Sequence, residues 1–469
     1  MRRRLCQFTR YVAGGSFLVA VAASSAGEAT PSQVEIPKIN FSHWELENGL
    51  QVYAVEDHAS PTVAVQVWYH VGAKDDPAGR SGFAHLFEHL MFKGNEHLKP
   101  DTMQQLTENA GGEINAYTAN DVTVYHEVLP SNYLEPVLWA EAERMSSLAV
   151  TDVNFHSERE VVKEEFRQRY AANPYGELAL AIPKSSYTIH PYKRSGIGNI
   201  AELDAATLPE VQRFHATFYR PENATLVVAG DFELKSLRDW IKRYFDDIPK
   251  VAEEVPRVQV KEPERKEDRH EIIYSAKAPL PAFAVTYLAP SVRSEDAVAL
   301  DVASDILSGG TSSRLYQSLV YEQQLAQSVS FGADMHEDLG VLTFEVTLAS
   351  GKAVTEVQRA LGTEIEKLLK DGVTEPELVK SKNRYLTGKL FQLETANGKA
   401  SALGSAAVIL GDANRVNTEL ARIQAITAEE VTAVLRKYIV DKKKVIIDYL
   451  PEAMKATPAP SASIATGER

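Results

Sequence analysis

Two histidines and a glutamate occur within five residues in the segment GFAHLFEHLMF, residues 82–92. The other side chains of this segment are apolar, which predicts a buried helix. On a helix, His85 and His89 lie four residues apart on one face, so both rings can reach a single ion. Glu88 lies beside them, where a carboxylate can accept a proton from a water molecule activated by the metal. The spacing therefore predicts a hydrolytic metal site with Glu88 as its general base.

The competing interpretation is a pair of core histidines that bond to backbone carbonyls. Burying two imidazoles and a carboxylate without partners would cost several kcal/mol. With 12 His and 64 acidic residues in the chain, a His-x-x-acid-His arrangement arises by chance in roughly 4% of such sequences. Both considerations favour the metal site.

A third ligand is expected from a second helix, SEREVVKEEF, residues 157–166. Four residues would share one face of it: Glu158, Val161, Val162 and Glu165. Carboxylates on an apolar face indicate a positive centre opposite them, so we expect Glu165 to coordinate the metal and Glu158 to orient a ligand or the water. The alternative, a solvated acidic face, suits Glu160 and Glu164.

The composition limits the class of protein. At 469 residues, 44% hydrophobic and 24% charged, the chain is long enough for two or more domains with real cores. Its formal net charge of -14 argues against nucleic acid as a partner, because such proteins need a basic surface.

The N-terminus is typical of a secretory signal. Three arginines precede an apolar stretch from about Tyr11 to Ala23, and small residues follow up to Ala26, where we expect cleavage. A membrane anchor is less favoured because the apolar run is shorter than the roughly 20 residues that span a bilayer. We expect a periplasmic protein without stable membrane insertion. The one cysteine, Cys6, would be removed, so the metal ligands must be His, Asp or Glu.

Alternating stretches at Thr62–Tyr69 and Thr123–Val128 predict strands, and helical patterns lie between them. The charged, proline-containing segment Val251–Arg269 predicts a connection between two bodies. We therefore expect five parts: a signal peptide at 1–26, an N-terminal metal-binding domain at 35–250, a linker at 251–269, a homologous C-terminal domain at 270–452 and a disordered tail at 453–469.

An internal repeat is visible at an offset of 220 residues. Thr207 and Glu210 form a capping-box pattern before a helix and the strand TLVVAG, and Thr427 and Glu430 do the same before KVIIDYL. Any two helix–strand units could share such a pattern, which is the alternative. We predict an α+β fold of two duplicated halves, each a mostly antiparallel sheet with helices packed on one side.

A glycine pair precedes another candidate strand in GGEINAYT, residues 111–118. Glycines allow close backbone approach, and an edge strand near the metal could pair with an extended peptide. An ordinary turn and strand is the alternative.

His-x-x-Glu-His is the inverzincin order of ligands and base. The chain resembles the pitrilysin or insulinase-like family of zinc peptidases, and within it the shorter proteins similar to the mitochondrial processing peptidase β subunit. Four stretches carry the resemblance: GRSGFAHLFEHLMFKG, GGEINAYTANDVTVYHEVLP, EREVVKEEFRQR, in which Glu165 lies 76 residues after His89, and FYRPENATLVVAGDF.

The resemblance implies two halves that face each other across a chamber, with one Zn²⁺ per chain in the first half. It implies His85, His89 and Glu165 as ligands, Glu88 as base and Glu158 as a supporting carboxylate. It also implies that two residues of the glycine-flanked strand contact the peptide substrate, namely Asn115 and Ala116.

The sequence departs from the family pattern in its second half. Active members commonly carry an Arg and a Tyr on either side of a Leu-Gly or Leu-Ala pair. Here the Arg position falls on Val320 or Tyr321 and the Tyr position on Gln327, unless Arg314 or Tyr316 substitutes. We therefore expect the zinc-bearing subunit of a hetero-oligomer, with a homologous partner that supplies the Arg and Tyr.

These observations predict an exported zinc endopeptidase acting on extended peptides. Two alternatives belong to other functional classes. One is a non-catalytic scaffold of the same fold, and the other is a peptide-binding, chaperone-like module.

Overall fold

The computed structural model describes residues 37–95 and 97–455. The expected signal peptide at 1–26 and residues 456–469 of the expected tail lie outside the described residues. Glu452–Met454, at the start of that tail, form a short 3-10 helix. Within the described ranges, no helix has both the length and the apolar character needed to cross a membrane.

The first half is built on a six-stranded sheet in the order β1-β2-β6-β3-β5-β4. Only β2 and β6 run parallel, and the other neighbours are antiparallel. The strands are β1 Ser42–Glu45, β2 Gln51–Glu56, β3 Thr62–Tyr69, β4 Glu113–Thr118, β5 Thr123–Pro130 and β6 Ala224–Gly230. The helices are α1 Phe83–Leu90, α2 Thr102–Asn109, α3 Leu134–Ser147, α4 Asp152–Phe166, α5 Gly176–Ser186, α6 Ile200–Ala205, α7 Leu208–Phe218 and α8 Leu234–Phe245.

The second half repeats this plan with a five-stranded sheet in the order β7-β11-β8-β10-β9. Strands β7 and β11 run parallel, as β2 and β6 do in the first half, and the other pairs are antiparallel. The strands are β7 Arg269–Ser275, β8 Ala282–Ala289, β9 Ala326–Met335, β10 Gly340–Leu348 and β11 Val445–Pro451. The helices are α9 Ala297–Ser308, α10 Val354–Asp371, α11 Glu375–Leu393, α12 Ala396–Val408, α13 Arg415–Ala425 and α14 Ala428–Ile439.

The matching strand orders confirm two duplicated α+β halves. The repeat also holds locally, because Thr207 with Glu210 and Thr427 with Glu430 both form capping boxes, at α7 and at α14. Each box satisfies backbone N–H groups at the first turn of its helix, and so fixes where that helix begins.

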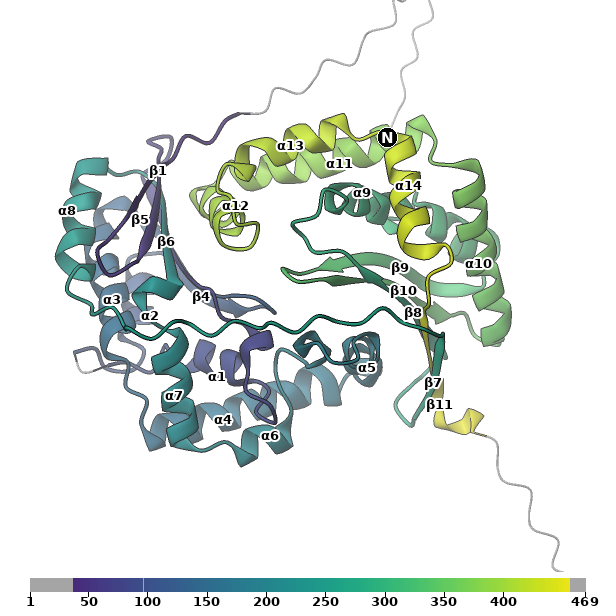
Figure 1. The fold of residues 1–469 in the computed structure, drawn as a ribbon, viewed down its shortest axis with the longest axis horizontal. Coiled ribbons are helices and arrows are strands. Elements are labelled where there is room, and N and C mark those ends of the chain that lie inside the picture. The colour runs from purple at the N-terminus through teal and green to yellow at the C-terminus, as the bar shows by residue number, and fades with distance from the viewer. Residues whose placement is uncertain (1–36, 96, 456–469) are drawn as a thin grey trace, which may run out of the picture. The chain divides into compact units, whose positions relative to one another are not determined.

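Each sheet is covered on its second face by a helix from the other half, which the sequence pattern did not predict. Helix α12 packs on β3 and β6 of the first sheet, and α5 packs on β8 and β11 of the second (Figure 1). These two helices begin 220 residues apart, so they are the same element of the repeat exchanged in both directions.

Residues on β3 explain how the exchanged helix α12 is held. Gln66 donates to Asn397 Oδ1 at 2.7 Å and to Ser401 Oγ at 2.9 Å on α12. The side-chain oxygen of Gln66, Oε1, accepts a hydrogen bond from Trp68 Nε1 at 2.9 Å. Strand β3 is therefore buried on both faces, and the buried Gln66 amide is bonded through both its nitrogen and its oxygen.

The charged connection between the halves has no helix or strand from 251 to 268 and is anchored along its length (Figure 1). Arg257 donates to Asn223 Oδ1 of the first half at 2.6 Å, and Arg265 donates to the backbone oxygen of Thr286 in the second at 2.9 Å. Between them, Glu262 accepts the backbone N–H of Ile189 at 2.9 Å. Residues 251–268 therefore form an extended segment that is hydrogen-bonded to both halves, and we call this segment the strap.

A buried ionic cluster also joins the halves. Lys74, in the short helix Ala73–Asp75, lies 2.8 Å from Asp121 of the β4–β5 turn and 2.7 Å from Glu337 of the β9–β10 turn. His70 Nε2 lies 2.8 Å from the same Glu337 carboxylate. Burial alone would raise the pKa of Glu337, but the hydrogen bonds and charges of His70 and Lys74 outweigh it and lower the pKa to about 2.

Close approach of α12 to the first sheet gives a stability prediction. A Cβ added at Gly404 would lie 2.3 Å from Trp68 Cε2. Gly404→Ala should therefore destabilise the protein by about 1–3 kcal/mol through overpacking. The matched control is Gly388→Ala in α11, where a Cβ meets nothing within 4 Å, and which should stabilise by about 0.5–1 kcal/mol. Urea unfolding measures both, and equal effects at the two sites would contradict this packing.

The lowered pKa of Glu337 gives a pH prediction. Its stabilisation is present above the usual pKa of 4.5 and is lost as the pH falls toward a folded-state pKa of about 2. That difference corresponds to about 3 kcal/mol lost between about pH 5 and pH 2. Glu337→Gln should remove this part of the acid dependence of unfolding free energy, as measured by urea titrations at a series of pH values. An unchanged acid slope would disprove the assignment.

Candidate metal centre

Helix α1 is fixed at its first turn by glycine and by a buried carboxylate. Gly82 precedes it with φ 95°, in the left-handed region that favours glycine. Asp76 accepts the N–H of Gly82 at 2.6 Å and that of Ala84 at 2.9 Å. Burial raises the pKa of Asp76 to about 7, although these hydrogen bonds act to lower it. The remaining apolar side chains of α1 pack into the core of the first half.

The two histidines of α1 converge with Glu165 of α4. His85 Nε2 and His89 Nε2 each lie 3.5 Å from Glu165 Oε2. One ligand atom from each of the three residues falls within 4.8 Å of the other two. A tetrahedral zinc site with bonds of about 2.0–2.1 Å has ligand atoms about 3.4 Å apart. The three side chains therefore fit a zinc ion.

His85 is suited to bind a metal because it is neutral. It is 7% exposed, and burial, followed by the charges of His89 and Arg169, lowers its pKa to about 3. Metal binding requires the unprotonated imidazole, so no proton has to be displaced from this ring at neutral pH.

Charged neighbours orient the other two candidate ligands. Glu158, buried on α4, lies 3.7 Å from His89 Nδ1 and 3.3 Å from Lys93 Nζ. Burial opposes the charged form of Glu158, but His89 and Lys93 outweigh it and lower the pKa of this carboxyl. Arg169 lies 3.1 Å from Glu165 Oε1, which leaves Oε2 directed at the histidines. Carboxylate partners of this kind fix the ring orientation of metal-binding histidines.

Helix α4 begins at Asp152, five residues before the segment expected to be helical, and the Thr151 side chain caps it by accepting the N–H of Asn154. Glu160 and Glu164 are exposed, which agrees with the interpretation that these two residues belong to a solvated acidic face. Val161 differs from expectation, because it is 45% exposed and not part of the buried face. The buried stripe is narrower than the sequence pattern suggested and runs through Glu158 and Val162 to the half-buried Glu165.

Glu88 lies beside the candidate ligands and is held by the edge strand β4. Its Oε2 accepts a hydrogen bond from Thr118 Oγ1 at 2.7 Å and lies 4.0 Å from His85 Nε2. Burial raises the pKa of Glu88, with Thr118 and His89 opposing it. A carboxylate with a raised pKa, fixed next to a metal site, has the character of a general base.

Strand β4 is an edge of the first sheet, as a peptide-binding strand has to be. Asn115 is exposed on it, and Ala116 is buried against the core. The Ala116 N–H bonds to Asn115 Oδ1 at 2.8 Å and not to the neighbouring strand. This amide is therefore on the open side of β4.

The second half offers no arginine at the expected position. Tyr321 there is 70% exposed, and Gln327 is exposed at the start of the edge strand β9. Arg314 is bound to Glu377, with Nη2 and Oε2 2.7 Å apart, and to the Gly372 carbonyl oxygen at 2.8 Å. Its guanidinium is thus engaged within the second half.

Two residues that position the site were not found by sequence reasoning. Asp76 anchors α1 from six and eight residues upstream, and Thr118 reaches Glu88 across 30 residues of chain. Neither has a periodic or motif signal of its own.

Comparisons with known families match both halves separately. Residues 51–199 match the family described as insulinase (peptidase family M16), and residues 205–385 match the peptidase M16 inactive domain. The first match contains α1 and α4, and the second contains α9 and α10 and ends within α11.

Individual relatives match most of the chain. A zinc protease PqqE of Helicobacter pylori is 31% identical over 386 residues, which cover 82% of this chain and 86% of the relative. A probable mitochondrial-processing peptidase subunit beta of Arabidopsis thaliana is 24% identical over 85% of this chain and 76% of its own. The crystal structure of a protease from Helicobacter pylori superposes with a TM-score of 0.85 at 28% identity, over 88% of this chain and all of that one.

The contact between Glu158 and His89 gives a metal-binding prediction. Glu158→Gln should weaken zinc binding about 10- to 100-fold, because it removes the charge that orients the His89 ring. Glu160→Gln, on the exposed face of the same helix, is the matched control and should leave zinc affinity unchanged. Competition with a chelating dye measures both, together with His85→Ala as the loss of a ligand. Equal affinity in the two glutamine variants would contradict the orienting role.

Proposed function

The chain belongs to peptidase family M16, and from that premise we propose that it is a zinc-dependent endopeptidase that hydrolyses extended peptides. The observation that carries this proposal is the convergence of His85 and His89 with Glu165, each 3.5 Å from the same oxygen, beside the carboxylate of Glu88. Relatives named as zinc proteases support the choice of metal.

In the proposed reaction His85, His89 and Glu165 hold the zinc ion. When bound, the ion would lower the pKa of a water molecule and polarise the peptide carbonyl. The Glu88 carboxylate takes a proton from the attacking water and gives it to the nitrogen of the leaving amine. Thr118 keeps this carboxylate in place through the hydrogen bond from its Oγ1. Glu158 keeps the His89 ring directed at the ion.

The substrate is proposed to extend along β4. An edge strand binds a peptide through backbone hydrogen bonds, which are independent of side-chain identity. The Ala116 N–H lies on the open side of this strand and is bonded there to the exposed Asn115 side chain, which a substrate carbonyl would replace as its partner. Thr118, two residues further along, connects the same strand to the base.

We propose that a homologous partner chain completes the site. The expected arginine and tyrosine are replaced by Tyr321 and Gln327, and Arg314 is bound to Glu377. No group described in the second half is therefore assigned to stabilise the oxyanion. The replacement of the expected arginine and tyrosine also favours a second candidate function, that of a non-catalytic scaffold or peptide-binding subunit of this fold.

Export to the periplasm and the division into domains complete the proposal. The basic, apolar and small-residue order of residues 1–26 supports a cleaved signal. The two sheets, with the strap between them, support an N-terminal zinc domain at 35–250 and a C-terminal domain at 270–452.

The test is peptide cleavage by wild type and by Glu88→Gln, each alone and mixed with a homologous partner chain. Glu88→Gln should lower the rate about 10²- to 10⁴-fold, because the general base is lost. It should retain zinc, since Glu88 is not among the ligands. The mixture should exceed wild type alone by about 10²- to 10³-fold, the usual effect of an oxyanion donor.

Zinc content by atomic emission serves as the control for an intact site. Cleavage by Glu88→Gln at the wild-type rate would exclude Glu88 as base. A wild-type chain that is as fast alone as in any mixture would exclude the partner. A chain that binds peptides but cleaves none, with or without partner, would favour the scaffold.

A further inference from the structure

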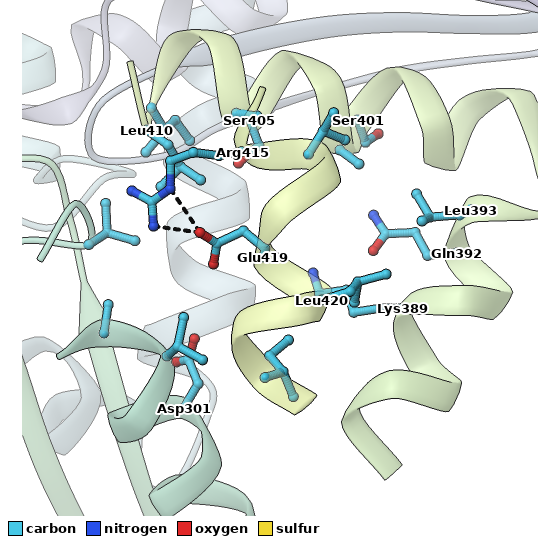
Figure 2. Close-up of a pocket in the computed structure, with 18 of the residues that line it drawn as sticks. Asp301, Lys389, Gln392, Leu393, Ser401, Ser405, Leu410, Arg415, Glu419 and Leu420 are labelled. Carbon is cyan, nitrogen blue, oxygen red and sulfur yellow. Dashed lines mark hydrogen bonds and ion pairs between the residues drawn. The ribbon is translucent and has the colours of Figure 1, made fainter. Parts of the chain in front are cut away.

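A cavity of about 380 Å³ lies between the first sheet and the helices of the second half. Two aromatic residues of the sheet line it, Trp68 on β3 and Tyr117 on β4. Helices α9, α11, α12 and α13 form its other walls (Figure 2). It is separate from the three candidate metal ligands, none of which lines it.

The cavity is suited to an uncharged, apolar group. Much of its wall is aliphatic, from residues such as Leu393, Ala402 and Leu420. Two of its charged residues, Arg415 and Glu419, neutralise each other in an ion pair of 2.6 Å (Figure 2). The other two charged residues of the lining, Asp301 and Lys389, carry opposite charges, so the lining has no net charge.

Hydrogen bonding shows which backbone groups of β4 are free for another strand. The Ala116 N–H bonds to Asn115 Oδ1, whereas Ala119, three residues on, bonds to Val122 across the hairpin. Successive residues of an antiparallel strand alternate between facing the neighbour and facing away. Ile114, Ala116 and Thr118 therefore direct their backbone groups off the sheet. Since the Thr118 side chain is bound to Glu88 through its Oγ1, the open edge ends at the candidate base.

The register of the sheet shows where side chains of an added strand would point. Tyr117 pairs with Val124, which pairs with Trp68, so these three share one face. Ala116, one residue away, is on the opposite face and belongs to the core packed against α1. Residues opposite each other in a sheet share a face. A residue paired with Tyr117 would thus direct its side chain toward the cavity, and its two neighbours would direct theirs toward α1.

We propose that this cavity binds an apolar side chain of the peptide substrate, that of the residue paired opposite Tyr117. The proposal rests on the proposed peptidase function and names the substrate feature that it selects. The exposed position of Tyr117, which is 42% accessible, places it at the mouth of the cavity and on the edge strand at once. The protein should therefore select peptides that have a large apolar residue at one fixed position from the scissile bond.

The test measures peptide binding to the full-length Glu88→Gln protein, so that cleavage does not interfere. Fluorescein-labelled nine-residue peptides of Ala and Thr carry a single Phe, moved one position at a time. Fluorescence anisotropy gives Kd for each. One Phe position should bind at least about tenfold more tightly than the peptide without Phe, which is the discrimination that a hydrophobic pocket supplies.

Three variants locate the effect. Ala402→Leu fills the cavity from α12 and should reduce the gain from Phe about tenfold, while binding of the Phe-free peptide is unchanged. Ala407→Leu adds the same group to the same helix outside the cavity lining and should preserve the gain. Tyr117→Ala, at an exposed site where folding is not at risk, should also reduce the gain. Circular dichroism verifies that each variant is folded.

Equal affinities at all Phe positions, or equal effects of Ala402→Leu and Ala407→Leu, would overturn the proposal. Binding of free phenylalanine amide without any position dependence in peptides would assign the cavity to a small molecule and overturn it as well. These results are distinct from failure of the proposed function, which would appear as wild-type cleavage by Glu88→Gln or as a wild type that cleaves no peptide.

Discussion

The constraint behind the first half is electrostatic. Two imidazoles and three carboxylates meet at α1, among side chains that are otherwise apolar. Each carboxylate has a specific partner there: Thr118 for Glu88, Lys93 for Glu158 and Arg169 for Glu165. Without such partners this concentration of negative charge would be too costly to bury. The segments that surround α1 therefore supply the hydrogen-bond donors and cations that pair with these three carboxylates.

The same region fixes how the two halves meet. Asp76 anchors α1, and two residues earlier Lys74 enters the buried cluster with Asp121 and Glu337. A short stretch of chain therefore connects the candidate metal centre to a turn of the second half. Movement of that turn would strain the helix that carries His85. Both hairpin turns in the cluster occupy equivalent places in the repeat.

The parts that were predictable from sequence are those with local, periodic causes. Helical spacing of four residues identified His85 and His89, and the capping boxes and the duplication followed from short patterns that recur. Glu165 was found because its helix carries an apolar stripe, although the width of the stripe was overestimated at Val161. Asp76 and Thr118 were missed because their partners are set by tertiary packing. The exchange of α5 and α12 was missed because covering either sheet leaves the same sequence pattern.

That exchange determines when the fold can be completed during synthesis. The second face of the first sheet stays open until residues 396–408 of α12 have emerged, although the last strand of that sheet, β6, ends at Gly230. Contacts this distant in sequence form late and slow folding. An N-terminal half released early would present the unpaired side of β3, with Trp68 exposed, to other chains. The topology therefore sets an order during synthesis: the half with the candidate metal ligands is completed only after most of the second half has been made.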